Sequence, residues 1–183
     1  IGNPEALRAL NEDPKRWDHV ISLVASDGNP SETIPDQLAV KIQNFICLGF
    51  DDILQDIPAQ SYGNPYYAPS KENVQTILDF ARKIKDGESL MIHCWAGKSR
   101  SSAAAFAILC DRAGKDVPAL DVLKYIAKRR FIGSGGRIRV SPNETFVQYA
   151  EDILGRTDML EAKRTVYDLM RDPLVWQSRG DSR

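Results

Sequence analysis

Hydrophobic and polar positions follow two different periods along this chain, and the period changes where turn-forming residues stand. Three short, mainly apolar runs, Val20–Ala25, Lys41–Leu48 and Leu90–Ile92, have the length and composition of buried strands. Apolar residues spaced three and four positions apart predict helices before, between and after them. The segments expected to be helical are Pro4–Leu10, Pro35–Val40, 70–86, Ser102–Gly114, Val117–Arg130, Ser141–Gly155 (with Ser141 as the cap) and Met159–Met170.

Strands that alternate with helices favour an α/β fold, with a mostly parallel central sheet and helices on both of its faces. In such sheets a ligand binds beyond the carboxyl ends of the strands. The 183 residues are enough for one domain with a buried core. We predict a single domain over 1–176 and a frayed tail at 177–183.

Charge and composition exclude some classes of partner. The net charge is -1, with 24 Lys and Arg against 25 Asp and Glu, so no polycationic face calls for nucleic acid. No apolar run approaches the roughly 18 residues of a membrane-spanning helix, and no signal peptide is visible. We therefore expect neither a nucleic-acid nor a membrane partner.

The most informative stretch is His93-Cys94-Trp95-Ala96-Gly97-Lys98-Ser99-Arg100-Ser101, between a predicted strand and a predicted helix. A strand, a tight turn and a helix suit a phosphate, because the first amides of a helix lack partners within the helix and point toward a ligand. A cysteine and an arginine separated by five residues, with a glycine between them, predict a loop that holds a phosphate against a sulfur nucleophile.

Each residue type in this loop suits that chemistry. A helix N-terminus and a nearby cation favour the thiolate form of Cys94, the expected nucleophile. Arg100 offers a guanidinium fork for two phosphate oxygens. Ser101 is expected to hydrogen-bond the sulfur, and His93 to orient the loop from behind by hydrogen bonds. Because a glycine lets the backbone curl into an anion nest, the expected phosphate-binding residues are Trp95, Ala96, Gly97, Lys98, Ser99 and Arg100.

The other cysteines have a simpler interpretation. We expect Cys47 and Cys110 to be small buried hydrophobes. Three cysteines and two histidines, with no second Cys-x-x-Cys or His-x-x-His cluster, do not complete a tetrahedral zinc site, so no metal and no cofactor is expected. A thiolate nucleophile needs reducing surroundings, which indicates a cytoplasmic protein without structural disulfides.

The pattern His93-Cys94-x-x-Gly97-x-x-Arg100-Ser101 resembles the signature of the cysteine-dependent protein tyrosine phosphatase superfamily. Size and layout resemble its dual-specificity branch, closest to small bacterial predicted tyrosine phosphatases. The resemblance covers about residues 1–156, including Ser141-Pro142-Asn143 and Leu154-Gly155-Arg156. It places Ile1 within the first strand of the family, so we expect native residues before it. It implies the phosphatase fold, a phosphorylated protein as partner, and inhibitory phosphate-like oxyanions in the loop.

A phosphatase of this kind also needs a general acid to protonate the leaving group. In the resembled family an aspartate does this, on a loop after a strand upstream of the nucleophile. Here Gly49-Phe50-Asp51-Asp52 follows a predicted strand, and the order of residues matches the family best at Asp52. An inserted loop over Gln55–Pro69 lengthens the interval to Cys94, so Asp51 and Asp56 stay open as alternatives.

The sequence therefore predicts hydrolysis of phosphomonoesters through a phosphocysteine, with phosphotyrosine in protein as the first choice of substrate and phosphoserine or phosphothreonine after it. One alternative is a catalytically weak binding module that holds phosphate or a phosphoprotein without turnover. A second alternative is hydrolysis of phosphoinositides or inositol phosphates, which would depend on Lys98 more than phosphotyrosine turnover does.

Overall fold

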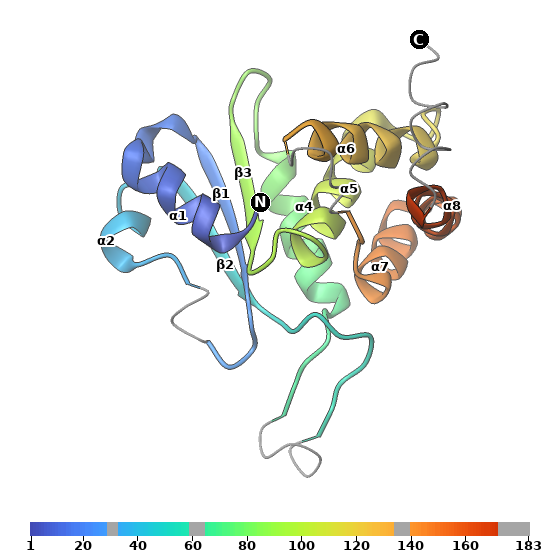
Figure 1. The fold of residues 1–183 in the computed structure, drawn as a ribbon, viewed down its shortest axis with the longest axis horizontal. Helices are drawn as coiled ribbons and strands as arrows, with labels where there is room; N and C mark the ends of the chain where they lie inside the picture. The colour runs from blue at the N-terminus through green and yellow to red at the C-terminus, as the bar shows by residue number, and fades with distance from the viewer. Residues whose placement is uncertain (29–32, 59–64, 134–139, 172–183) are drawn as a thin grey trace.

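The sheet is built around β1 (His19–Val24), whose six residues are all buried. A computed structural model describes residues 1–28, 33–58, 65–133 and 140–171, so the tail predicted at 177–183 lies outside the described residues. β1 pairs in parallel with β2 (Asn44–Gly49) on one side and with β3 (Leu90–Cys94) on the other (Figure 1). A central parallel strand is covered on both faces, which explains why the sequence of β1 is almost continuously apolar.

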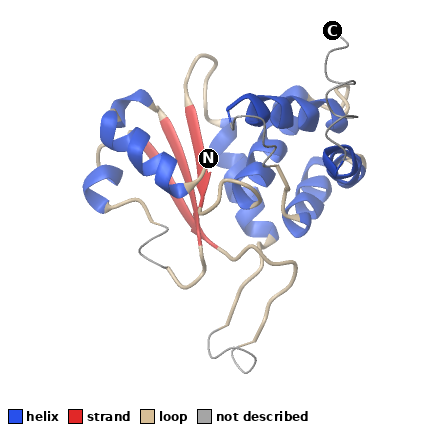
Figure 2. Cartoon of the chain, in the orientation of Figure 1, coloured by secondary structure: helices blue, strands red, loops and turns tan. Residues whose placement is uncertain are grey.

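Helices cover both faces of this sheet (Figure 2). One face carries α1 (Asn3–Glu12) and the short α2 (Asp36–Ala39), and the 3₁₀ helix η1 (Pro14–Arg16) leads into β1. The helices on the other side are α4 (Lys71–Arg82), α5 (Arg100–Ala113), α6 (Ala119–Gly133), α7 (Glu144–Leu154) and α8 (Met159–Arg171). The α/β architecture predicted from the sequence, with a parallel sheet between helices, is confirmed.

Side chains alternate across each strand, so the two faces of the sheet contribute to two separate cores. Ile21 and Leu23 of β1 point into the larger core together with Cys94 of β3. Val20 and Met91 point into the smaller core against α1 and α2. Cys94 therefore faces the α5 side of the sheet, where the following helix begins.

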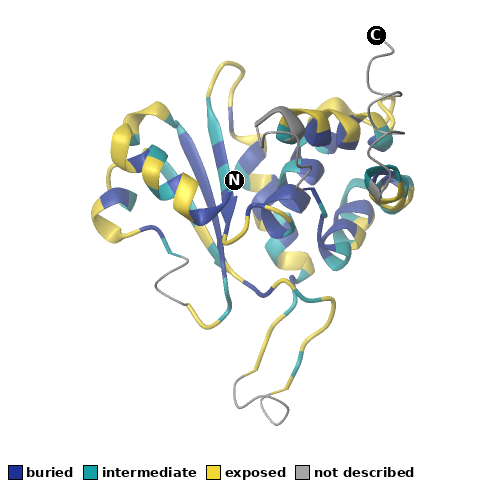
Figure 3. Cartoon of the chain, in the orientation of Figure 1, coloured by how far each residue is buried: buried dark blue, intermediate teal, exposed yellow. Residues whose placement is uncertain are grey.

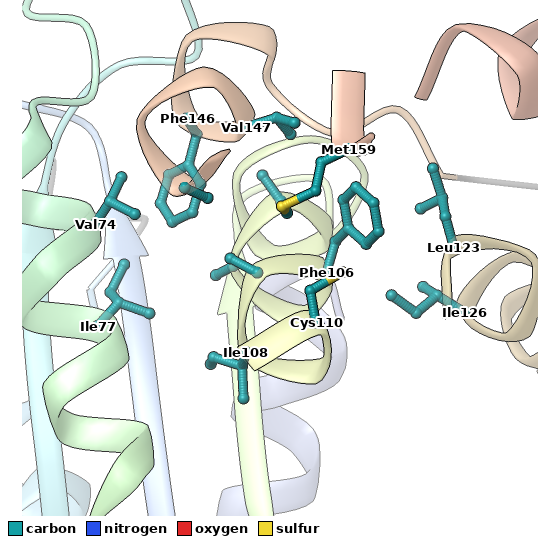
Figure 4. Packing of buried hydrophobic residues seen from close by; sticks show 14 of the residues in the cluster. Val74, Ile77, Phe106, Ile108, Cys110, Leu123, Ile126, Phe146, Val147 and Met159 are labelled. Atoms are coloured by element: carbon teal, nitrogen blue, oxygen red, sulfur yellow. The ribbon is translucent and has the colours of Figure 1, made fainter. Parts of the chain in front are cut away.

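The α5 helix lies at the centre of the larger core. Figure 4 shows Phe106 of α5 between Met159 at the start of α8 and Leu123 of α6, and all three side chains are fully buried. Burying one aromatic side chain of this size stabilises the fold by roughly 1.5–3 kcal/mol. The exposed residues lie mainly on the outer faces of the helices and in loops, while the strands stay largely covered (Figure 3). The helix that follows Cys94 is thus held on several sides.

Two details of β2 differ from the prediction. The strand begins at Asn44 rather than at Lys41, because the amides of Lys41 and Ile42 donate to carbonyls at the end of α2. Cys47 is exposed rather than buried, since β2 is an edge strand of the described sheet. Cys110 is buried as predicted, and the remaining predicted strands and helices are present within a few residues of their expected limits.

The predicted insertion follows β2. Its two described limbs, 55–58 and 65–69, run side by side away from the body of the molecule (Figure 1). Ile57 and Tyr66 form an antiparallel bridge, with both N–H···O distances at 2.9 Å. The limbs therefore have their own backbone pairing, and the segment that precedes them stays close to the sheet.

Candidate active site

Cys94 is the last residue of β3, at the carboxyl edge of the sheet, and is 3% exposed. Its Sγ lies 3.3 Å from Oγ of Ser101, a residue in the first turn of α5. A hydroxyl at this distance can donate a hydrogen bond to a thiolate and stabilise its charge. In Cys110, by contrast, burial raises the pKa of the thiol to about 12, which makes it an inert part of the core. All three cysteines are free thiols.

The loop between Cys94 and α5 has its carbonyl groups turned outward. Four of them accept hydrogen bonds from groups outside residues 95–100. The pairs are Asn3 N to Trp95 O (3.0 Å), Arg130 Nη2 to Gly97 O (2.5 Å), Ser141 N to Lys98 O (2.9 Å) and Ser102 Oγ to Ser99 O (2.9 Å). In a planar trans peptide the N–H points opposite to the C=O. The amides of the residues that follow each carbonyl therefore face away from these donors, toward the inside of the loop, as an anion nest requires.

Gly97 allows this turn. Its φ is +62°, in the left-handed region that favours glycine. A Cβ at this position would overlap the backbone of Ile1 and Gly2, with Ile1 O only 2.8 Å away. Both the backbone angle and the close approach to the N-terminal segment therefore require a glycine here.

The N-terminus of α5 faces the same loop. Ser99 occupies the N-cap position of this 14-residue helix, but its side chain makes no capping hydrogen bond. Its hydroxyl instead donates to Oδ1 of Asp52 at 2.5 Å. The first amides of α5 are thus left without the usual serine cap, and the positive end of the helix dipole is directed at the loop.

Arg100 is the first residue of α5 and is 6% exposed. Its Nη1 donates to the carbonyl oxygen of Phe50 at 3.0 Å. This bond joins the loop that follows Cys94 to the segment that carries Asp51 and Asp52, two of the candidate acids. A buried guanidinium fixed at one nitrogen is restricted in orientation, which suits bidentate binding of an oxyanion.

Asp52 lies next to the loop, although it precedes Cys94 by more than forty residues in the sequence. It is exposed, and its Oδ1 accepts hydrogen bonds from Ser99 Oγ at 2.5 Å and from Asn143 Nδ2 at 3.1 Å. Among the three aspartates proposed from the sequence, the described contacts connect this one directly to the Cys94–Arg100 loop.

The two alternative acids make other contacts. Asp51 is buried and accepts hydrogen bonds from the amides of Ser26 and Tyr67 and from the Ser26 hydroxyl, so it joins the end of β1 to the returning limb of the insertion. Asp56 is exposed and accepts a hydrogen bond from Ala68 N at 2.7 Å. Both carboxylates are used to hold the backbone of the insertion.

His93 differs from the prediction. It is fully buried on the face of β3 opposite to Cys94, and neither ring nitrogen has a hydrogen-bond partner among the residues that the structure describes. The expectation that it orients the loop by hydrogen bonds is therefore wrong, because its ring lies on the far face of β3 and makes none with the described residues. Burial lowers the pKa of His93 to about 4, and charge repulsion from the α-amino group of Ile1 and from Arg100 adds to this effect.

This shift predicts loss of stability in acid. An unfolded histidine takes up a proton near pH 6.5, whereas folded His93 resists it down to about pH 4. The contribution of His93 to the free energy of unfolding is thus fully present above pH 6.5. It falls by about 3 kcal/mol as the pH drops to 4 and does not change further below that pH. Urea unfolding of the parent chain and of His93→Leu at pH 7, 5.5 and 4 measures this. The variant is expected to lose stability less steeply, and equal slopes would contradict the assignment.

Within residues 1–28, 33–58, 65–133 and 140–171, no group of three or more His, Cys, Asp or Glu side chains is arranged to hold a metal ion. None of the helices in these ranges is long and apolar enough to span a membrane.

Sequence reasoning missed several residues that hold the loop in place. Asn3, Arg130 and Asn143 contact the loop or Asp52 from three distant parts of the chain. For Asn143 the resemblance supplied a weak signal, because a Pro-Asn pair opens a late helix in that family. The structure shows that Asn143, rather than Ser141, is the N-cap of α7, since its side chain accepts from Phe146 N at 3.0 Å. No local pattern marks the other two.

No protein-family model matches the sequence, and no curated protein does so. Solved structures are similar in fold. Tk-PTP in its active form is 18% identical, with 82% of this chain and 87% of that chain covered and a TM-score of 0.55. PTPMT1 is 16% identical, with 92% and 91% covered and a TM-score of 0.55. DUSP15 is 19% identical, with 92% and 89% covered and a TM-score of 0.52.

The fold is therefore that of the cysteine-dependent protein tyrosine phosphatases.

Proposed function

We propose that this protein is a cysteine-dependent phosphomonoester hydrolase that acts on phosphotyrosine in proteins through a phosphocysteine. The observation that carries the proposal is one cluster: the Cys94 thiol, the inward-facing amides of its loop, Arg100 and Asp52 all meet at the carboxyl edge of β3. A nucleophile, an oxyanion cradle and an acid are the three parts that phosphoryl transfer needs.

In the first step, Cys94 Sγ attacks phosphorus as the bond to the ester oxygen breaks. Arg100 and the amides of residues 95–100 stabilise the charge on the equatorial oxygens. Asp52 gives its proton to the leaving oxygen, so the alcohol or phenol departs neutral. The product of this step is a phosphocysteine with Asp52 ionised.

In the second step, a water molecule attacks the phosphocysteine. Asp52 takes a proton from this water, the S–P bond breaks, and inorganic phosphate forms. Ser101 Oγ, 3.3 Å from Sγ, supports the departing thiolate by donating a hydrogen bond. The enzyme returns to its initial state, with Cys94 as thiolate and Asp52 protonated.

The exposed side chain of Trp95 supports an aryl substrate. It lies directly after the nucleophile and is 48% exposed. A large exposed aromatic ring at the mouth of the loop is suited to stacking on the phenyl ring of phosphotyrosine.

Because the Cys94 thiol must stay reduced to act as nucleophile, we also infer a cytoplasmic location.

The proposal is tested with Asp52→Asn and its matched control, Asp51→Asn. Asp52→Asn is expected to lower kcat on a phosphotyrosine peptide by about 10²–10³-fold, because a phenol needs protonation. It should lower kcat far less on 2,4-dinitrophenyl phosphate, whose leaving group needs no proton. Asp51→Asn is expected to reduce the free energy of unfolding by about 1–3 kcal/mol, with the ratio of the two rates unchanged.

Three results would each contradict a different part of the proposal. If the unmodified chain turns over neither ester, the phosphatase function is wrong. If Asp51→Asn shows the selective loss and Asp52→Asn does not, the acid is misassigned. PI(5)P serves as a comparison substrate, since PTPMT1 is known in complex with it. A kcat/KM for PI(5)P above that for the peptide, lowered selectively by Lys98→Met, would replace phosphotyrosine with a phosphoinositide.

A further inference from the structure

The segment that opens α7 contacts both loops of the candidate active site. The amide of Ser141 donates to the carbonyl of Lys98 at 2.9 Å, within the loop that follows Cys94. Two residues later, Asn143 Nδ2 donates to Asp52 Oδ1 and to the carbonyl of Ile53, both at 3.1 Å. Residues 141–143 thus link the loop that would bind phosphate to the segment that carries the acid.

The two ends of the Asn143 side chain have different tasks. Its Oδ1 accepts a hydrogen bond from Phe146 N at 3.0 Å and caps α7. Its Nδ2 is directed to Asp52 and Ile53. The residue is 4% exposed, so its rotamer is fixed by packing as well as by these bonds. A cap alone needs only the oxygen, and serine or aspartate would serve equally well there.

The hydrogen bonds on Asp52 distinguish its two oxygens. Oδ1 accepts from both Ser99 and Asn143. An oxygen that accepts two donors is a poor place for a proton, since the proton would point at a hydrogen already there. The acidic proton therefore belongs on Oδ2, the oxygen left to face a leaving group.

We propose that Asn143 is a positioning residue that holds Asp52 by Oδ1 and so directs protonated Oδ2 at the leaving oxygen. This inference rests on the proposed phosphatase function and deepens it. Thr145 provides a comparison, because its Oγ1 donates to the carbonyl of Leu54 at 2.7 Å. It holds the same segment from the same helix without contacting the carboxylate of Asp52.

The experiment compares Asn143→Ser and Asn143→Asp with Thr145→Val. Both Asn143 variants keep a side-chain oxygen for the cap of α7 and remove the N–H donor to Asp52. Each is expected to lower kcat on a phosphotyrosine peptide by about 10- to 100-fold, the usual cost of a misplaced catalytic group. On 2,4-dinitrophenyl phosphate each should change kcat by less than about 3-fold, because that leaving group does not use the acid. Thr145→Val should affect both substrates equally.

A double-mutant cycle separates positioning from a general structural effect. In the Asp52→Asn background, Asn143→Ser should cause no further loss on the peptide, since the acid it positions is absent. An additive loss, or an equal loss on both substrates with an unchanged melting temperature, would overturn the inference. If the unmodified chain hydrolyses neither ester, the proposed function fails first. Turnover that depends on Asp52 but not on Asn143 would overturn the positioning role alone.

Discussion

Replacing Cys94 with serine is expected to abolish turnover, with a loss in kcat of at least about 10⁴-fold on a phosphotyrosine peptide. A serine hydroxyl ionises far less readily than a thiol, so the two-step route through a covalent intermediate closes. The cradle should survive, because its carbonyls are held by Asn3, Arg130 and Ser141 rather than by Cys94. Steady-state kinetics, isothermal titration of inorganic phosphate, and acid-quench trapping of a phosphorylated protein measure turnover, binding and the intermediate separately.

The matched control is Cys47→Ser, which changes an exposed thiol on β2 and should leave all three measurements unchanged. If the Cys94→Ser variant retains activity, Cys94 is not the nucleophile. Phosphate binding by the unmodified chain, without turnover and without a trapped intermediate, would instead identify a recognition module that shares the phosphatase loop.

Gly97→Ala is also expected to have a large effect, a loss in kcat/KM of about 100-fold or more. An alanine there adds the strain of a left-handed backbone, about 1–2 kcal/mol. Its Cβ also overlaps the backbone of Ile1 and Gly2. That segment cannot move independently, because Ile1 O accepts a hydrogen bond from Cys94 N at 3.2 Å and Gly2 bridges to Cys94. Relief of the overlap therefore displaces the nucleophile or its amides.

Gly155→Ala separates strain from overlap. Gly155 has φ +60° in the same left-handed region, but the nearest atom to its Cβ is the flexible end of Lys115, at 3.0 Å. Thermal unfolding and peptide kinetics on both variants form the measurement. Gly155→Ala should lower stability by about 1 kcal/mol with unchanged kcat/KM. If Gly97→Ala behaves in the same way, the close contact with residues 1–2 does not control the site.

The parts of the fold that the sequence predicted depend on local information. The run before Cys94 and the alanine-rich stretch after it predict a strand and a helix, and β3 and α5 form there. The loop between them is short and has a glycine at its turn. Periodicity likewise placed the start of α4 and both ends of α8 within a residue or two, because each helix has one clear apolar face. The predicted end of α4 was wrong by four residues, since the helix stops at Arg82 rather than at residue 86.

The parts that escaped prediction depend on contacts between distant segments. Adjacent Asp51 and Asp52 are alike in sequence, and only the fold turns one toward Ser26 and Tyr67 and the other toward Ser99. The burial of a strand residue likewise depends on its neighbours, so Cys47 on the edge strand is exposed. Such outcomes follow from tertiary packing, which overrides local preference.

The outward carbonyls of the Cys94 loop have a consequence for how the chain folds. Three of their four partners come from residue 3, residue 130 and residue 141, so the cradle closes only when both halves of the chain have reached the edge of β3. Each of these contacts spans a long stretch of sequence and carries a loop-closure entropy that only the complete core can offset. A partly folded chain would have the cysteine but no arranged amides. Phosphate affinity should therefore arise late in folding, together with the cooperative native state.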